Sequence, residues 1–354
     1  MKTLLVRADG GQDIGAGHIM RCLAIAQEWR ARGGRVVFAS AVLDPTLADR
    51  LEREHCETLL LDVERGQQPD AEKTRALAER LDAEWLLLDG YCFDAEYQRD
   101  VRGTSHMAML DDTGVLGPYG VDLLVNQNLH ADEAMYRNAR GARLLLGPDH
   151  TLLRDEFLKH GEAQRSVPDV ARRVLVTLGG SDVAGHTLKV LAALRQLVDP
   201  DLDFIVVVGA SNPHANEIAA SAATEARIKI LAVVEDMASL MAWADLAICS
   251  GGSTVWELAY MGVPTIVGSV ALVEERLAAG LVAHGLFTYL GSFADIEPAD
   301  LATAIAGLQL DASARGDMGR RGNEVVDGGG RQRVVLTMNT IAQGRAYRSQ
   351  RVGK

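Results

Sequence analysis

The chain has 354 residues, of which 48% are hydrophobic and 24% are charged, and its formal net charge is −12. These values are typical of a soluble globular protein and argue against broad binding to nucleic acid or a membrane surface, although a local basic pocket for an anionic ligand stays open. The chain is longer than an ordinary domain built on a single hydrophobic core, so we expect two domains. The four cysteines form no Cys-x-x-Cys pair, which argues against a zinc ribbon or a disulfide framework.

The first part of the chain alternates apolar runs with helical patterns. The runs predict strands at residues 4–6, 36–40, 58–61, 85–89, 107–110 and 123–126. Helices are expected between most of them, such as residues 71–81 and 94–101. This alternation is typical of a doubly wound parallel sheet, so we assign residues 1–158 to an N-terminal Rossmann-like domain. Residues 159–172 are mostly polar and contain Pro168, which predicts a linker.

A second alternating unit follows the predicted linker. Its strands are expected at residues 173–178, 204–208, 228–231, 246–249 and 265–267. Helical stretches such as residues 186–197 and 237–244 separate these strands, and late helices are expected at residues 299–308 and 332–342. We assign residues 173–331 to a C-terminal Rossmann-like domain, and residues 332–354 to a helix or tail that is able to cross back to the first domain. The fold class is therefore α/β, with two doubly wound domains expected to face a cleft.

The loop before residue 19 is the first candidate for chemistry. Four glycines between residues 10 and 17 allow a tight turn and a close approach to a ligand, and Gly15 and Gly17 directly precede His18. The spacing does not fit the dinucleotide fingerprint, because no glycine stands at position 20. We predict that His18 is catalytic; the alternative is a histidine beside the helix N-cap that hydrogen-bonds backbone. Asp13 is expected to contact a sugar, and Asp9 to be buried scaffold.

Both halves contain a related loop in which Gly-Gly-x-Asp leads to Gly-His and a helix. In the second half this loop predicts ligand contacts from Gly180 and Ser181. The alternative, held equally, is a glycine-rich connection that the topology requires. Arg21 is expected to pair with a carboxylate inside its domain, and the amides Asn126–Asn128 are expected to hold loops together rather than bind acetamido groups.

A second candidate site follows the strand predicted at residues 246–249. The sequence Ser-Gly-Gly-Ser-Thr opens a helix, so the amides and hydroxyls of Ser253 and Thr254 are expected to cradle phosphate, with Gly252 leaving room. Glu257 follows one turn later and is expected to accept hydrogen bonds from a ribose diol. The alternative is a capping box made by these same residues.

These motifs, in this order, resemble the UDP-sugar hydrolases of the pseudaminic acid pathway, which have a glycosyltransferase-B-type fold. The resemblance covers nearly the whole chain. It rests on Gly-x-Gly-His-x-x-Arg-Cys at 15–22, Asn-Gln-Asn at 126–128, Leu-Leu-Arg-x-Glu-Phe at 152–157, Gly-Gly-Ser-Asp at 179–182, Gly-Gly-Ser-Thr with Glu257, and Gly-Gly-Gly-Arg at 328–331.

The resemblance implies hydrolysis of a UDP-linked deoxy-diacetamido sugar at its anomeric carbon for nonulosonic acid synthesis. His18 would activate water, since a histidine ordinarily titrates near neutral pH and general base catalysis contributes about 10²–10⁴-fold. Tyr91 would contact the sugar; the alternative is that it covers the end of the sheet. The C-terminal domain would hold UDP. No metal and no cofactor are implied, and the expected partner is a UDP-sugar, with no nucleic acid.

The sequence departs from the pattern of these hydrolases in one place, and two other functions are therefore considered. Where the hydrolases tend to carry an Asn-Gln pair, equal spacing here gives Val273 and Glu274. A carboxylate near a diphosphate is repulsive, and valine forms no side-chain hydrogen bond. The alternatives are a glycosyltransferase that uses a UDP-sugar donor and a catalytically inactive nucleotide-sugar-binding relative. The absence of a signal peptide and of a membrane-length apolar run predicts a cytoplasmic protein; a monomer is compatible with the sequence.

Overall fold

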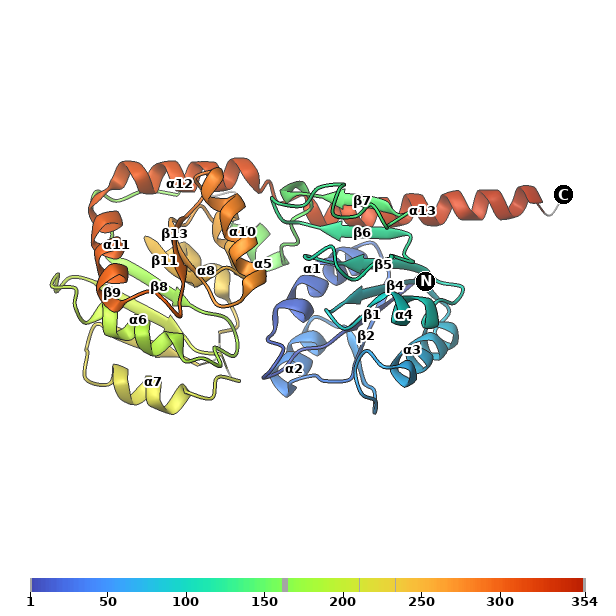
Figure 1. The fold of residues 1–354 in the computed structure, drawn as a ribbon, viewed down its shortest axis with the longest axis horizontal. Coiled ribbons are helices and arrows are strands. Elements are labelled where there is room, and N and C mark those ends of the chain that lie inside the picture. Colours follow the sequence, from blue (N-terminus) through green and yellow to red (C-terminus); the bar gives the residue numbers. More distant parts are fainter. Residues whose placement is uncertain (1, 161–164, 210, 233, 353–354) are drawn as a thin grey trace. The chain divides into compact units, whose positions relative to one another are not determined.

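The computed structural model describes residues 2–160, 165–209, 211–232 and 234–352. The chain divides into two compact units (Figure 1). Unit 1 comprises Met1–Gly11, Ala16–Arg154 and Gly329–Lys354, and unit 2 comprises Gln12–Gly15 and Asp155–Gly328. Among the described residues, no helix combines the length and the apolar character needed to cross a membrane.

Unit 1 is built on a parallel sheet of seven strands in the order β3-β2-β1-β4-β5-β6-β7. The strands are β1 Thr3–Ala8, β2 Arg35–Ser40, β3 Glu57–Leu60, β4 Ala83–Asp89, β5 His106–Leu110, β6 Leu123–Asn126 and β7 Arg143–Leu146. Along the chain, β2 and β3 are added on one side of β1, and β4 to β7 are added on its other side. The switch point of this doubly wound sheet therefore lies between β1 and β4.

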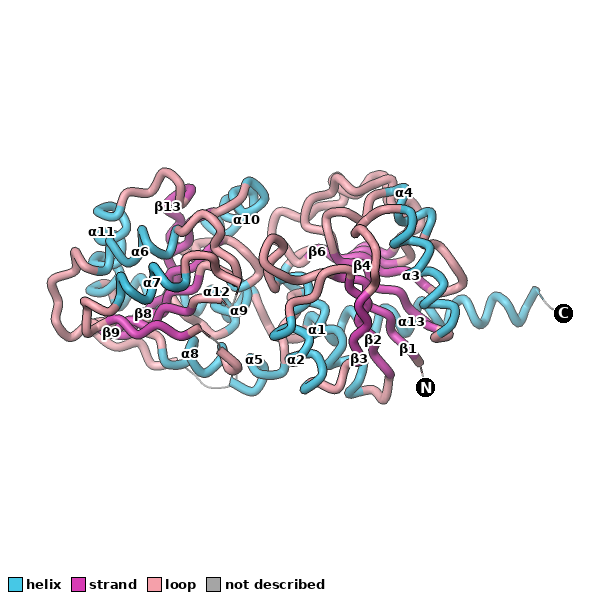
Figure 2. The backbone as a smooth tube through the Cα atoms, turned by 90° about the horizontal axis from the view of Figure 1, so that it is seen from below, coloured by secondary structure: helices cyan, strands magenta, loops and turns pink. Residues whose placement is uncertain are grey.

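Helices cover both faces of this sheet (Figure 2). They are α1 Gly17–Ala31, α2 Pro45–Arg53, α3 Gln68–Arg80, α4 Ala95–Asp100, α13 Gly330–Val352 and the 3₁₀ turn Pro148–His150. Alternate strand residues point to opposite faces, so Leu4 packs in the core with α1 and α13, whereas Leu5 packs in the core with α3 and α4. Val334 and Met338 of α13 are buried in the first of these cores. The last helix of the chain is thus part of unit 1.

Unit 2 repeats this plan with six parallel strands in the order β10-β9-β8-β11-β12-β13. The strands are β8 Arg173–Thr177, β9 Asp203–Val207, β10 Ile228–Leu231, β11 Leu246–Ser250, β12 Thr265–Ser269 and β13 Thr288–Ser292. The helices are α5 Asp155–His160, α6 His186–Leu194, α7 Ala215–Ala222, α8 Met237–Trp243, α9 Thr254–Tyr260, α10 Leu272–Ala283, α11 Pro298–Leu310 and α12 Ala312–Val325. The prediction of two doubly wound α/β domains is confirmed.

The segment predicted as a linker is attached to unit 2 where the structure describes it. Residues 161–164 lie outside the described residues. Arg165 donates from Nη1 to the carbonyl of Met241 at 3.1 Å, and the buried guanidinium of Arg315 donates to the carbonyls of Pro168 and Asp169. The division between the units falls after Arg154 rather than after residue 158, because the short helix α5 packs on α8.

Candidate active site

His18 stands at the start of α1, directly after the loop that follows β1. Gly15 has φ +78°, in the left-handed region that other residues seldom adopt, so this turn favours glycine. The helix begins at Gly17, which makes His18 its second residue. The His18 side chain is 11% exposed, so the protein holds one part of the ring and leaves another part open to solvent.

Asp89 is the hydrogen-bond partner of His18. In the sheet register Asp89, the last residue of β4, lies opposite Ala8, the last residue of β1. Both residues stand at the switch point, where open α/β sheets bind ligands. Asp89 Oδ1 is 2.7 Å from His18 Nδ1. Because an ionised carboxylate only accepts, Nδ1 carries the proton and Nε2 of the neutral ring is the basic nitrogen.

Arg21 holds the same carboxylate from the other side. Its Nε donates to Asp89 Oδ2 at 2.7 Å, and its Nη2 donates to Oδ1 at 2.6 Å, which makes a bidentate pair. Its Nη1 donates to Asp112 Oδ2 at 2.6 Å. Arg21 therefore pairs with carboxylates of its own unit, as the sequence predicts.

These contacts fix the charge of Asp89. Burial alone raises the pKa of a carboxyl, but attraction to Arg21 and His18, together with the hydrogen bonds they make, holds the pKa of Asp89 well below its usual range. Cys22 contacts the same carboxylate, with Sγ 3.4 Å from Oδ2. Burial and the negative charge of Asp89 raise the pKa of this thiol well above its usual value, so it stays protonated and is a poor nucleophile.

Tyr91 lies beside His18. The two rings meet edge to face, with centroids 5.1 Å apart and an interplanar angle of 81°. Tyr91 is 51% exposed, so part of this side chain is open to solvent next to the histidine. The structure thus brings two of the predicted site residues together; the sugar contact predicted for Tyr91 stays a prediction.

The amide cluster after β6 makes hydrogen bonds within unit 1. Asn126 Nδ2 donates to the hydroxyl of Tyr136 at 2.7 Å, and Asn128 Nδ2 donates to Asp112 Oδ1 at 2.7 Å. Gln127 accepts the backbone N–H of Leu152 at 2.9 Å. All three amides are buried, which fits the loop-holding role that the sequence favours.

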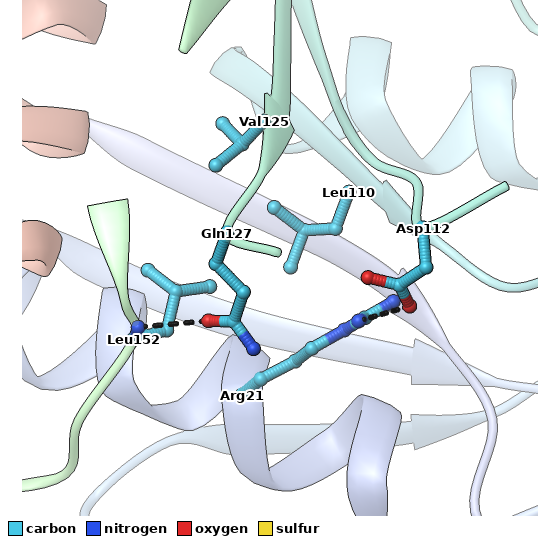
Figure 3. A pocket seen from close by; sticks show the side chains of 6 residues that line it. All are labelled: Arg21, Leu110, Asp112, Val125, Gln127 and Leu152. Carbon is cyan, nitrogen blue, oxygen red and sulfur yellow. Dashed lines mark hydrogen bonds and ion pairs between the residues drawn. The ribbon is translucent and has the colours of Figure 1, made fainter. Parts of the chain in front are cut away.

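Figure 3 shows the small apolar recess between Arg21 and this cluster. Leu110, Val125 and Leu152 line it together with the side chains of Arg21, Asp112 and Gln127. It leaves no room for a water molecule, so it serves packing rather than binding. In the figure the guanidinium of Arg21 meets the carboxylate of Asp112 at one side of the recess.

Asp9 and Asp13 are the other acidic residues between β1 and α1. Asp9 is buried, pairs with Arg7 at 2.8 Å, and accepts the backbone N–H groups of Ala41 and Val42. It is scaffold, as expected. Asp13 is exposed in the turn before α1. The residue that orients His18 is Asp89, which we did not predict from the sequence.

In unit 2, the glycine loop after β8 is shaped by Asp182. Its carboxylate accepts the N–H groups of His186 and Thr187 and the Thr187 hydroxyl, so it caps α6. A Cβ on Gly209, in the loop after β9, would lie 1.9 Å from the carbonyl oxygen of Gly180. Gly180 and Ser181 are partly exposed in a loop that these contacts hold in place.

The Gly-Gly-Ser-Thr loop follows β11, which pairs in parallel with β8. The loops after these two strands therefore leave the same edge of the sheet. Gly252, Ser253 and Thr254 are partly exposed, and Glu257 is buried in the first turn of α9. Ser253 is the N-cap residue, but its side chain makes no capping hydrogen bond, so the capping-box alternative is wrong for this residue.

Glu274 of α10 reaches the same loop. Its Oε2 accepts the N–H of Gly251 at 3.2 Å and the N–H of Val270 at 2.8 Å. Burial raises the pKa of its carboxyl, although both hydrogen bonds oppose that shift. The carboxylate that departs from the family pattern thus lies directly against the first glycine of the predicted phosphate cradle.

Comparison with known proteins agrees with this architecture. Residues 174–270 match the model of the glycosyltransferase family 28 C-terminal domain. The crystal structure of *Acinetobacter baumannii* MurG superposes with a TM-score of 0.66 at 18% identity, covering 96% of this chain and 100% of that one. The fold is of the glycosyltransferase-B type. Within the described residues, no three His, Cys, Asp or Glu side chains gather in a way that could hold a metal ion.

Two relatives match most of this glycosyltransferase-B-type chain. The *Bacillus subtilis* (strain 168) spore coat polysaccharide biosynthesis protein SpsG is 26% identical over 94% of this chain and 97% of its own length. A *Campylobacter jejuni* protein named UDP-2,4-diacetamido-2,4,6-trideoxy-beta-L-altropyranose hydrolase is 23% identical over 72% of this chain and 86% of its own length. The resemblance inferred from the motifs is therefore confirmed as a distant one.

Proposed function

We propose that this protein is a UDP-sugar hydrolase that cleaves the anomeric C–O bond of a UDP-linked deoxy-diacetamido sugar, for nonulosonic acid synthesis. The observation that carries the proposal is the pairing of His18 with Asp89 at the switch point of the unit 1 sheet. The similarity to the *Campylobacter jejuni* hydrolase supports the substrate class.

In the proposed reaction, His18 Nε2 takes a proton from water as the water oxygen bonds to the anomeric carbon. The bond from that carbon to the phosphate oxygen breaks, and its electron pair leaves with UDP. Asp89 stabilises the imidazolium that forms, since its carboxylate already accepts the Nδ1 proton. General base catalysis of this kind requires a histidine that is held by a hydrogen bond and has one basic nitrogen toward the ligand.

The proposed binding residues come from the loops described above. On the sugar side they are Asp13, Gly15, Gly17 and Tyr91. On the UDP side they are Gly180, Ser181, Gly252, Ser253, Thr254 and Glu257. Backbone amides at the Gly-Gly-Ser-Thr loop would stabilise the negative charge that grows on the departing UDP, and the Glu257 carboxylate would accept from the ribose hydroxyls.

The test is to incubate the protein with UDP-2,4-diacetamido-2,4,6-trideoxy-β-L-altropyranose and to measure UDP and free sugar by chromatography. We expect equal amounts of both products without any added acceptor. UDP release that His18→Ala leaves unchanged would reject the assigned mechanism.

The second candidate function is transfer of the sugar to a glycan or polysaccharide acceptor. The match of residues 174–270 to a glycosyltransferase domain and the likeness to a spore coat polysaccharide biosynthesis protein favour it. A transferase would release UDP slowly in water and faster when its acceptor is added. The same assay, with and without acceptor glycans, separates the two functions.

The third candidate is a nucleotide-sugar-binding protein without catalysis. The contact of Glu274 with the Gly251 N–H favours it, because a carboxylate at this loop opposes the negative charge that would grow on a departing UDP. Calorimetry that shows UDP binding, together with no turnover of any UDP-sugar donor, would support this candidate over the other two.

A further inference from the structure

The guanidinium of Arg21 lies close to the imidazole of His18 as well as to Asp89. Arg21 Nη2 is 3.4 Å from His18 Nδ1, while it donates to Asp89 Oδ1 at 2.6 Å. The same Asp89 oxygen is 2.7 Å from His18 Nδ1. One carboxylate oxygen is thus shared by the histidine and the arginine.

The two partners act on the charge of His18 in opposite directions. A carboxylate at 2.7 Å favours the imidazolium, and a guanidinium at 3.4 Å disfavours it. Asp89 Oδ1 opposes any tautomer that leaves Nδ1 bare, because it would then repel the lone pair of Nδ1, and the bidentate pair with Arg21 holds that oxygen in place.

Three other titratable groups lie near the ring or its partners. From α1, Cys22 contacts Asp89 as a neutral thiol. From the turn after β4, the neutral Tyr91 meets the ring edge to face. From the loop after β5, Asp112 acts through Arg21, whose Nη1 it accepts at 2.6 Å. Arg21 is therefore the cation that offsets Asp89 at His18.

We propose that Arg21 is a positioning residue that keeps His18 neutral, with its proton on Nδ1, so that Nε2 is able to accept a proton from water. The kinetic consequence of this role rests on the proposed hydrolase function. The role itself concerns the ring of His18 and is measurable without substrate.

Three variants test this role. Arg21→Met removes the charge, Arg21→Lys keeps the charge but loses the planar fork, and Asp112→Asn removes the anion on the far side of Arg21. Arg35→Met is the matched control, because Arg35 makes a bidentate pair with Glu57 at 2.6 Å on the exposed side of unit 1. Thermal unfolding and circular dichroism show which variants keep the fold.

The first measurement is the charge and tautomer of His18 by ¹H–¹⁵N correlation of the imidazole rings over a pH series, with the His18 signal assigned from His18→Gln. We expect the Nδ1–H tautomer in the unsubstituted protein. In Arg21→Met the imidazolium should persist to a higher pH, and in Asp112→Asn it should disappear at a lower pH. Arg21→Lys should lie between the unsubstituted protein and Arg21→Met.

The second measurement is the pH dependence of kcat/KM for UDP release. Its acid limb should move in the same direction as the imidazole signal in each variant, and Arg35→Met should leave it in place. A His18 signal that titrates identically in the unsubstituted protein and in folded Arg21→Met would overturn the role of Arg21. If Arg21→Met does not fold, the Asp112→Asn variant decides. The role of Arg21 is overturned if the His18 imidazolium of Asp112→Asn disappears at the same pH as in the unsubstituted protein or at a higher one. Expected imidazole shifts without any UDP release would reject the hydrolase function and leave the role of Arg21 standing.

Discussion

Arg7 and Asp70 form an ion pair in the interior of unit 1, where neither side chain is exposed to solvent. Arg7 Nε donates to Asp70 Oδ1 at 2.9 Å, and Nη2 donates to Oδ2 at 2.7 Å. Arg7 lies in β1 and also pairs with Asp9, so this interaction joins α3 to the strand and the loop that lead to His18. The strand that leads to the candidate base is thus joined to α3 by a buried ion pair.

Asp70→Asn should destabilise unit 1 by about 3 kcal/mol, because it leaves a buried guanidinium short of one partner. The expected loss is measured by urea unfolding at neutral pH. Thr46→Ala, which removes an exposed hydroxyl that Asp44 accepts, is the control and should change stability by about 1 kcal/mol or less. A loss in Asp70→Asn no larger than in the control would contradict the importance of the pair.

The same pair predicts a dependence of stability on pH. Burial raises the pKa of Asp70, but hydrogen bonds and attraction from Arg7 outweigh burial, so the folded-state pKa lies below the ordinary value. The resulting stabilisation is present above the unfolded pKa, about 3.9, and is lost as the pH falls through the folded-state value. Urea unfolding from about pH 7 to about pH 3 should show a smaller acid loss in Asp70→Asn than in the unsubstituted protein. Equal losses would contradict this assignment.

Glu274→Gln should strengthen UDP binding about threefold to tenfold at neutral pH. The amide oxygen still accepts from Gly251 and Val270, while the negative charge beside the loop is removed. Glu275→Gln, an exposed neighbour on α10, is the matched control and should have little effect. Calorimetric titration with UDP measures both. Unchanged or weaker binding in Glu274→Gln would show that its charge does not oppose the nucleotide.

Gly209→Ala should destabilise unit 2 by about 1–3 kcal/mol and weaken UDP binding, because its Cβ would clash with the carbonyl of Gly180. Gly307→Ala is the matched control: Gly307 lies within α11 and has open space around it, so the same substitution should stabilise the helix by about 0.5–1 kcal/mol. Thermal unfolding that moves in the same direction for both variants would contradict this account.

His18→Ala should lower the rate of UDP release about 10²–10⁴-fold without weakening UDP binding. The reason is that the proposed base acts on water while other residues hold the nucleotide. His284→Ala replaces an exposed histidine at the end of α10 and serves as the control. Steady-state kinetics and calorimetry together make the test, and a parallel loss of UDP binding in His18→Ala would contradict the division of roles.

The sequence was sufficient to predict most of the fold, because alternating apolar runs and helical spacing are local signals. It missed β7 and β13, which are short edge strands with partly exposed residues; the apolar run of β7 is only three leucines long. It also missed α12, whose glycines disfavour a helix. A Cβ on Gly319 or Gly322 would lie 2.7 Å from the carbonyl of Gly262 or 2.5 Å from that of Ala259, so these glycines allow α12 to pack closely on α9.

The candidate base was predictable, but its partner was not. A glycine-rich turn before His18 is a local pattern that the sequence displays. Asp89 lies 71 positions away, and it meets His18 only because β4 returns to the side of β1. Spacing along the chain does not reveal the order of strands in a sheet, so the sequence did not identify Asp89 as the partner.

The central claim is that water attacks the anomeric carbon with His18 as the base, and hydrolysis in ¹⁸O-labelled water tests it most directly. With UDP-2,4-diacetamido-2,4,6-trideoxy-β-L-altropyranose as substrate, mass spectrometry of the early products should find the label at the anomeric hydroxyl of the free sugar and none in UDP. In the His18→Ala variant, the label should enter the free sugar much more slowly than in the unsubstituted protein. Label in the phosphate of UDP, or UDP release that requires an added acceptor, would contradict the claim.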